Sequence, residues 1–194
     1  INSIEVKGDN TVPHDEIKKS ILSEKGAIYN VSQIRQDMVT VTDMYSSQGF
    51  AYADINPLTN INDQTHTVDL SIEIDKGKKV YVGEINMLGN IKTKDNVIRR
   101  EFRLKEGEVF DGSKLKRSKQ RINNLNYFED VKIDTQRGED PDLIDILATV
   151  TEKPTGTFTV GAGFSSVENL IFTTSIAQNN LFGNGHRVNL TASL

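Results

Sequence analysis

The sequence predicts an α+β chain in which two tandem β-α-α-β-β units are followed by the first antiparallel strands of a transmembrane β-barrel. Three observations lead to this fold class. The pattern of residues 1–79 returns in residues 80–153, with Gly8 and its counterpart Gly89 separated by 81 positions (89 − 8 = 81). Strand-type and helix-type hydrophobic periods follow one another in the same order in both copies. From residue 154 onward charge nearly disappears, while the alternation typical of strands continues.

The internal repeat extends over most of the first 153 residues. "SIEVKGDN" (3–10) reappears as "EINMLGNI" (84–91), and "SEKGAIYN" (23–30) reappears as "LKEGEVFD" (104–111). Repeats of ~75–80 residues are too long for solenoid units and suit small domains. We expect one domain at residues 1–77, a second at 78–153, and about three barrel strands at 154–194.

Each unit is expected to begin with a strand and a helix. Ile4 and Val6 alternate with polar neighbours before a glycine turn, and Ile85 and Met87 do so in the second copy. The first helix follows Pro13, whose missing amide suits a helix start. Its buried pair has i,i+4 spacing, Ile17 with Ile21 in the first unit and Ile98 with Phe102 in the second.

A second helix and two strands complete each unit. Ile34, Met38, Val41 and Tyr45 form the apolar stripe of this helix in the first copy, and Leu115, Ile122 and Leu125 form it in the second. Asn30 and Asp111 are the expected N-caps. The strands are expected at residues 51–58, 66–74, 129–136 and 142–150. Two helices on one face of a three-stranded sheet give a sound α+β layer.

The tail from residue 154 has a different character. Phe158, Val160, Ala162 and Phe164 share one face of an expected strand, and small or polar residues occupy the other. A turn is expected at 165–169, followed by a strand at 170–178, and a second turn at 179–186, followed by a strand at 187–194. The only charged residues of the segment are Glu168 and Arg187, whereas a soluble sheet normally carries Lys and Glu on its wet face. We therefore expect these strands to face lipid within a barrel that three strands cannot close, so that the chain is a fragment; three strands of a soluble sandwich are the alternative.

Composition excludes several other classes of function. The charge of −4 resides in residues 1–79 (8 − 12 = −4), while residues 80–153 balance (14 − 14 = 0), so a nucleic-acid-binding surface is not expected. The chain lacks cysteine, and its three histidines lie in three different segments without triad or metal-ligand spacing. "GAG" (161–163) and "GNG" (183–185) match no phosphate-binding pattern. We expect no enzyme activity, no cofactor and no metal site.

Several stretches resemble one family. They are "YSSQGFAYADI" (45–55), "VYVGEINMLGN" (80–90), "VIRREFRLKEGEVFDGSKL" (97–115), "RINNLNYFEDVKIDTQ" (121–136), "TGTFTVGAGFSS" (155–166) and "QNNLFGNGHRV" (178–188). Together they are similar to the POTRA domains and barrel entrance of the BamA-type outer-membrane protein assembly factors. The resemblance covers essentially the whole chain and implies the last two of five POTRA domains, followed by the first three of sixteen barrel strands.

The resemblance implies a function without a cofactor. Proteins of this family fold and insert other β-barrel proteins into the outer membrane, with their POTRA domains in the periplasm. Unfolded outer-membrane proteins, accessory lipoproteins of the assembly complex and outer-membrane lipid are the implied partners. Related translocators for two-partner secretion, autotransporter assembly or organelle import share the plan, and a periplasmic scaffold module is a hypothesis of a different class.

Three sets of candidate residues follow. A client strand could add to the edge formed by the second strand of each unit, although Pro57 blocks pairing at one position of the first edge. These edges comprise Ala51, Tyr52, Ala53, Asp54 and Ile55, together with Glu129, Asp130, Val131, Lys132 and Ile133. The charged helix 94–103 is the candidate lipoprotein-docking face through Arg99, Arg100, Glu101 and Arg103, and an ordinary solvated helix is its alternative.

The third set is the first barrel strand, which in the family meets the last strand in a weak seam that opens into the membrane. Its glycines lower intrinsic strand stability, so this edge could template an incoming strand; the alternative is that they only fit curvature or crowding. The seam strand comprises Gly156, Thr157, Phe158, Thr159, Val160, Gly161, Ala162, Gly163 and Phe164.

Overall fold

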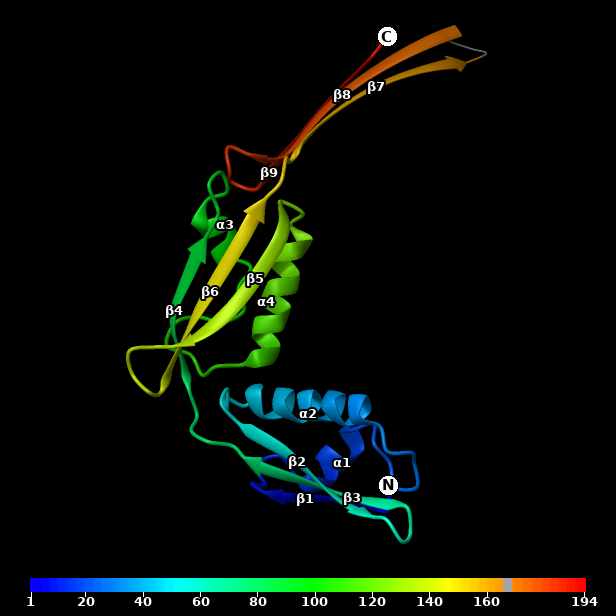
Figure 1. Cartoon of the computed structure of the whole chain (residues 1–194). Coiled ribbons are helices and arrows are strands. Elements are labelled where there is room, and N and C mark those ends of the chain that lie inside the picture. Colours follow the sequence, from blue (N-terminus) through cyan, green and yellow to red (C-terminus); the bar gives the residue numbers. More distant parts are fainter. Residues whose placement is uncertain (166–168) are drawn as a thin grey trace. The chain divides into compact units, whose positions relative to one another are not determined.

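The structure, a computed structural model, describes residues 1–165 and 169–194 (Figure 1). The turn predicted at 165–169 therefore has its centre outside the described residues. The chain forms two compact units. One contains Ile1–Gly83, Leu104–Leu115 and Arg137–Ile144, and the other contains Glu84–Arg103, Lys116–Gln136 and Asp145–Leu194.

The first repeat has the predicted order of elements. It consists of β1 (Ser3–Gly8), α1 (His14–Ser20), α2 (Val31–Ser46), β2 (Asp54–Asn62) and β3 (Thr67–Asp75). The sheet order is β1-β3-β2, with β1 parallel and β2 antiparallel to the central strand. Both helices cover one face of this sheet (Figure 1). The core lies between the helices and the sheet, and Ile17 of α1 with Val41 and Tyr45 of α2 are fully buried in it.

Side-chain caps fix where α2 begins. The Oδ1 atom of Asn30 accepts hydrogen bonds from the amides of Ser32 and Gln33, at 2.9 and 3.4 Å, as predicted. The buried carboxylate of Asp37 also accepts from the amides of Leu22 and Ser23, at 2.6 and 3.0 Å, which ties the preceding loop to the helix.

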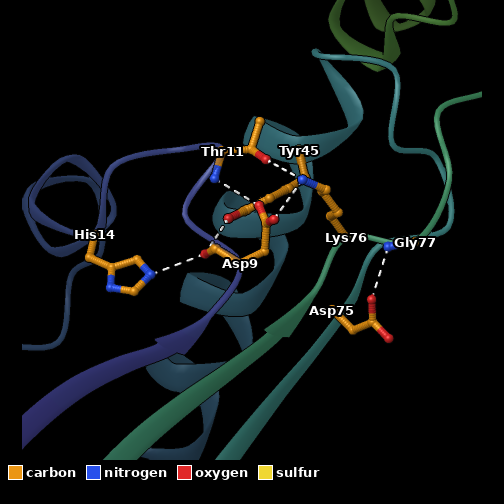
Figure 2. A network of polar contacts seen from close by, with 7 residues as sticks. All are labelled: Asp9, Thr11, His14, Tyr45, Asp75, Lys76 and Gly77. Atoms are coloured by element: carbon orange, nitrogen blue, oxygen red, sulfur yellow. Dashed lines mark hydrogen bonds and ion pairs between the residues drawn. The ribbon is translucent and has the colours of Figure 1, made fainter.

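A network of polar contacts joins the loop after β1 to the last turn of α2 and to the residues that follow β3 (Figure 2). Lys76 Nζ lies 2.7 Å from the Asp9 carboxylate and donates to Thr11 Oγ1 at 2.9 Å, while the Thr11 amide donates to Asp9 at 2.7 Å. The backbone carbonyl of Asp9 accepts from Tyr45 Oη at 3.1 Å and from His14 Nε2 at 3.0 Å. Burial raises the pKa of the Asp9 carboxyl, but hydrogen bonds from Lys76 and Thr11 outweigh it and lower that pKa to about 2.

The edge strand β2 begins three residues later than predicted. After α2 the chain makes consecutive turns, in which Phe50 N donates to Tyr45 O and Ala53 N donates to Phe50 O. Gly49, with a φ of 100°, allows this reversal. The strand prediction is therefore wrong for Ala51, Tyr52 and Ala53, which lie in the turn, while β2 continues to Asn62.

The second repeat repeats the same order. It consists of β4 (Tyr81–Leu88), α3 (Asp95–Arg99), α4 (Gly112–Asn124), β5 (Phe128–Arg137) and β6 (Leu143–Glu152), in the sheet order β4-β6-β5. Asp111 caps α4 by accepting from the Lys114 amide at 3.0 Å, as predicted. Ile98, Ile122 and Val150 lie in its core.

The helix predicted at 94–103 is shorter than expected. It ends at Arg99, because Glu101 N donates to Ile98 O and Phe102 N donates to Arg99 O, three residues back instead of four. Arg100, Glu101 and Arg103 therefore lie in the turns that follow α3, not on a helix.

The duplication extends to a close backbone approach. Gly8 and Gly89 have φ values of 94° and 86°, and a Cβ atom at either position would lie 2.2 Å from Ile74 O or 2.0 Å from Val150 O. Only glycine fits such a position without strain. The first strand of each repeat thus ends in the same way against the third strand.

The C-terminal strands form a third sheet. It contains β7 (Gly156–Ser165), β8 (Asn169–Leu181) and β9 (His186–Ser193) in the order β7-β8-β9, all antiparallel. Phe158 pairs with Ile176, which pairs with Leu190, so the apolar positions of the three strands share one face, as predicted. The second turn is shorter than the predicted 179–186, because β8 continues through an irregularity between Gln178 and Leu181. In the part of the chain that the structure describes, no helix combines the length and apolar character needed to cross a membrane.

Candidate functional site

The candidate client-binding strands lie at the edges of their sheets. Asp54 and Ile55 belong to β2, and residues 129–133 belong to β5, whereas residues 51–53 do not belong to a strand. On β5, Val131 is buried, while Glu129, Asp130 and Lys132 are exposed. Lys132 Nζ lies 3.7 Å from Asp130 Oδ2. Exposed charges on an edge strand keep it from pairing indiscriminately.

The candidate docking cluster is held together by its own ion pairs. Arg99 reaches Asp95 at 3.2 Å and donates to the Ile85 carbonyl at 2.9 Å. Glu101 lies between Arg100, at 3.5 Å, and Arg121 of α4, at 2.8 Å. The structure therefore brings Arg121 into this cluster. Sequence reasoning missed it, because a contact between residues 20 positions apart leaves no local pattern.

Strand β7 forms one edge of the C-terminal sheet and shows two contrasting faces. Phe158, Val160 and Phe164 are exposed on the apolar face, at 67%, 64% and 79%. The other face carries Thr157, Thr159, Gly161 and Gly163, and a Cβ at either of those two glycines would meet nothing within 4 Å. The glycines of this strand are therefore not required by crowding among the described residues.

A set of hydrogen bonds joins the second repeat to the β8–β9 turn; we call it the junction. The Thr93 side chain is buried and its Oγ1 accepts from Asn180 Nδ2 at 2.9 Å. Asn180 Oδ1 in turn accepts from the Gly185 amide at 2.8 Å, which holds the turn closed. Because both side chains are buried, each bond satisfies a group that water cannot reach.

Backbone contacts strengthen the junction. The Lys94 amide donates to the Gly183 carbonyl at 3.0 Å, and Tyr127 Oη donates to the Gly185 carbonyl at 3.2 Å. Gly183 has a φ of 71°, and a Cβ there would lie 1.9 Å from Lys92 O, so the turn approaches the loop closely. The first residues beyond β4 and the turn between β8 and β9 are thus in direct contact.

Glu152, the last residue of β6, organises the loop on which the junction depends. Its carboxylate accepts from the amides of Lys92 and Thr93, with bonds of 2.9 Å and 2.6 Å. Burial raises the pKa of this carboxyl, but a hydrogen bond from the Thr93 side chain, the two amide hydrogen bonds and the Lys92 charge outweigh it, so the pKa lies below its ordinary value. Glu152 is therefore ionised at neutral pH.

Sequence reasoning did not find the junction. The run "NNLFGNG" was interpreted as a turn, and Thr93 and Asn180 are 87 positions apart. A usable signal was present, because paired asparagines and two glycines within seven residues are more than a simple hairpin needs.

The fold and its site define a class of protein: tandem β-α-α-β-β domains joined through a tight junction to an antiparallel sheet with an exposed apolar face. The chain belongs to the POTRA family, whose model, described as "Surface antigen variable number repeat", matches residues 1–77 and 80–153.

Curated relatives carry the same plan. The chain is similar to "Outer membrane protein assembly factor BamA" of Neisseria meningitidis serogroup B, with 36% identity over 98% of this chain and 24% of the relative. It is 35% identical to the protein of that name from Nitratidesulfovibrio vulgaris, over 82% of this chain and 20% of the relative. The chain thus spans about a quarter of the length of the curated relatives it matches. These relatives are outer-membrane proteins, and the chain is assigned to the outer membrane with its POTRA domains in the periplasm.

Solved structures share the fold. BamA from Haemophilus ducreyi lacking POTRA domains 1–3 superposes with a TM-score of 0.85 at 24% identity, over 100% of this chain and 37% of that one. CdiB from Escherichia coli gives a TM-score of 0.51 at 17% identity, over 100% of this chain and 35% of that one.

Proposed function

We propose that the chain is part of a factor that assembles β-barrel proteins in the outer membrane, binding nascent clients by strand addition and helping to insert them. The observation that carries the proposal is the position of β7 at the edge of the C-terminal sheet, one face of which is apolar and exposed. The relatives named as outer-membrane protein assembly factors support the same function.

Strand addition suits the side chains of β7. An incoming strand pairs with backbone N–H and C=O groups, so its own sequence matters little beyond alternation. One face of β7 is apolar and meets lipid, and the other carries threonine and glycine from Thr157 to Gly163, which leave room for varied client side chains. Glycine also lowers the stability of the strand in its own sheet, which favours opening of the edge. The process exchanges hydrogen bonds, so the proposed function is not that of an enzyme and needs no cofactor.

The domain assignment is part of the proposal. Residues 1–77 and 78–153 act as the fourth and fifth POTRA domains of a longer protein, and residues 154–194 form the first three strands of its transmembrane barrel. The superposition on BamA that lacks POTRA domains 1–3 supports this order.

The periplasmic edges are further binding places in this proposal. Clients add to β2 from Asp54 and to β5 along residues 129–133, and Pro57 removes one amide from the first edge. An accessory lipoprotein of the complex docks on the cluster of Arg99, Arg100, Glu101 and Arg103, now extended by Arg121. The ion pair between Arg99 and Asp95 is half exposed, so it is weak and can exchange for a partner's carboxylate.

Crosslinking on the full-length protein in outer membranes tests the central step. Single cysteines are placed at each position from Thr157 to Phe164 and tested for disulfides with a substrate barrel that carries one cysteine in its terminal strand. Strand addition predicts crosslinks in one fixed register, because each β7 residue opposes one client residue.

The central strand β8 provides the matched control. Cysteines at residues 173–178 lie in a strand already paired on both sides, so they should not crosslink to a client. Crosslinks without register, or equally from β8, contradict templating. A β7 locked to its barrel neighbour would instead favour a translocator that uses its pore.

A further inference from the structure

A cavity of about 470 Å³ lies beside the junction. It is bounded by the loop after β4, the end of β6, the start of β7 and the β8–β9 turn, and its lining includes Lys92, Lys153, Gly156 and Gln178. All of these segments belong to one compact unit. Neither the POTRA repeats nor strand addition at β7 requires a cavity here.

The charge of the lining favours an anion. The lining contains two lysines and one carboxylate, that of Glu152, whose oxygens already accept hydrogen bonds from the amides of Lys92 and Thr93. Lys153 Nζ is steered by Asn126 Oδ1 at 2.6 Å and keeps two further hydrogens. The Thr155 hydroxyl bonds to Gln178 Oε1 at 2.7 Å, which orients the Gln178 amide so that Nε2 is available as a donor. Lysine and amide donors around one space suit a phosphate.

The position of the cavity along β7 and β8 indicates that the phosphate belongs to a membrane lipid. The apolar face of β7 begins at Phe158, two residues after Gly156, and that of β8 ends at Ile176, two residues before Gln178. At about 3.3 Å per residue these two strands place the cavity about 7 Å beyond their apolar faces, while on β9 the apolar Val188 pairs with Gln178, so the cavity lies at the edge of the apolar band. Phosphates of a bilayer occupy the zone just outside its hydrocarbon core.

Phe182 gives a second, independent observation. It lines the cavity, is 81% exposed, and has a φ of 53°, which is unfavourable for a bulky residue. Strained backbone tends to persist where function requires it. Aromatic side chains are enriched at the level where membrane meets water. Phe182 follows Leu181 in the β8–β9 turn, on the side of Gln178 away from Ile176, so this exposed phenylalanine fits the headgroup side of the membrane boundary.

We propose that this cavity binds the phosphodiester of a glycerophospholipid, held by Lys92, Lys153 and Gln178, with Phe182 beside the headgroup. The inference rests on the proposed function insofar as the apolar face of β7–β9 meets the membrane. A bound lipid at this place would anchor the junction to the inner leaflet.

The test uses the full-length protein in detergent and native mass spectrometry, with phosphatidylglycerol as the probe. The paired variant K92Q/K153Q should retain the lipid about tenfold more weakly than wild type, because two charge-assisted contacts are lost. F182A, which keeps both lysines, should weaken retention about threefold. The control K105Q/K119Q removes the same charge from exposed positions outside the lining and should match wild type.

Two results would overturn the proposal. Equal retention by wild type and K92Q/K153Q would exclude the cavity as the lipid site. Displacement of the lipid by millimolar inorganic phosphate would mean that the cavity takes a free anion and not a lipid headgroup.

Heat-modifiability and client assembly by the wild-type protein are measured separately. If wild type assembles clients while the variants retain lipid equally, the cavity proposal fails and the proposed function stands. Wild-type protein that never forms a heat-modifiable barrel would reject the proposed function, and the detergent measurement would still decide on the cavity.

Discussion

Buried polar side chains determine the junction at the scale of single residues. Thr93 and Asn180 are 2% and 8% exposed, so a lost partner could not be replaced by bulk water. Asp37 has the same role in the first repeat, where it accepts two amides from the loop before α2. Thr93 and Asp37 belong to no local motif, and the run "NNLFGNG" that contains Asn180 does not name its partner, so only the structure identifies these contacts.

Asn180→Ala should loosen the junction. It removes the bonds to Thr93 and Gly185, so that the buried Thr93 hydroxyl loses one of its partners and the half-buried Gly185 amide loses its acceptor, at a cost of about 1–3 kcal/mol. Hydrogen exchange of the full-length protein should then be about 10–100-fold faster at the amides of Lys94 and Gly185. Asn184→Ala, a change of the same chemistry in the same turn, should leave both rates as in wild type.

Gly89→Ala should destabilise the second repeat by about 1–3 kcal/mol, because the new methyl group meets Val150 O and the φ of 86° is unfavourable for alanine. A lower midpoint of urea unfolding would register the loss. Gly161→Ala is the matched control, since a Cβ there meets nothing within 4 Å. A midpoint for Gly89→Ala as high as that of the control would show that the first strand need not approach the third so closely.

At the scale of elements, the order of helices and strands follows from the sequence, and their ends do not. Periodicity identified all five elements of each repeat and the alternation of β7–β9, because each element carries a regular apolar face. The start of β2 and the end of α3 depend on turns whose hydrogen bonds run three or five residues back, and these leave no hydrophobic period. The candidate edge positions followed from the family resemblance, whereas the junction and its cavity depend on contacts between distant segments.

The apolar face of the C-terminal sheet gives an element-scale prediction. Val160→Arg or Phe172→Arg should block barrel assembly, because a charge near the bilayer midplane costs about 2–4 kcal/mol. The heat-modifiable band of the full-length protein on gels measures assembled barrel. Thr159→Arg and Thr173→Arg carry the same charge on the opposite face and should assemble much more. Wild-type levels in the first pair would contradict the lipid-facing assignment.

Charge is distributed unevenly over the whole molecule, and two carboxylates make its stability depend on pH. Asp9 and Glu152 each anchor one repeat, and the pKa of each is lower in the folded chain than its ordinary value. Such groups stabilise the fold above their unfolded pKa, and the contribution disappears as pH falls through the folded pKa.

For Asp9, this contribution should be lost between about pH 4 and pH 2, since its pKa falls from 3.8 to about 2 on folding. Asp9→Asn should lower the urea midpoint at pH 6 and flatten its fall between pH 4 and pH 2, as followed by far-UV circular dichroism. Asp63→Asn, in the exposed hairpin between β2 and β3, should retain the wild-type profile. A profile of Asp9→Asn as steep as that of wild type would remove Asp9 from the acid response.

The threonine and glycine face of β7 has an evolutionary consequence under the proposed function. A binding edge that reads only backbone groups requires no matching side chains, so mutations in a client are not followed by compensating mutations here. Client genes can then diverge freely, or arrive by transfer from another organism, and still be served by the same unchanged strand.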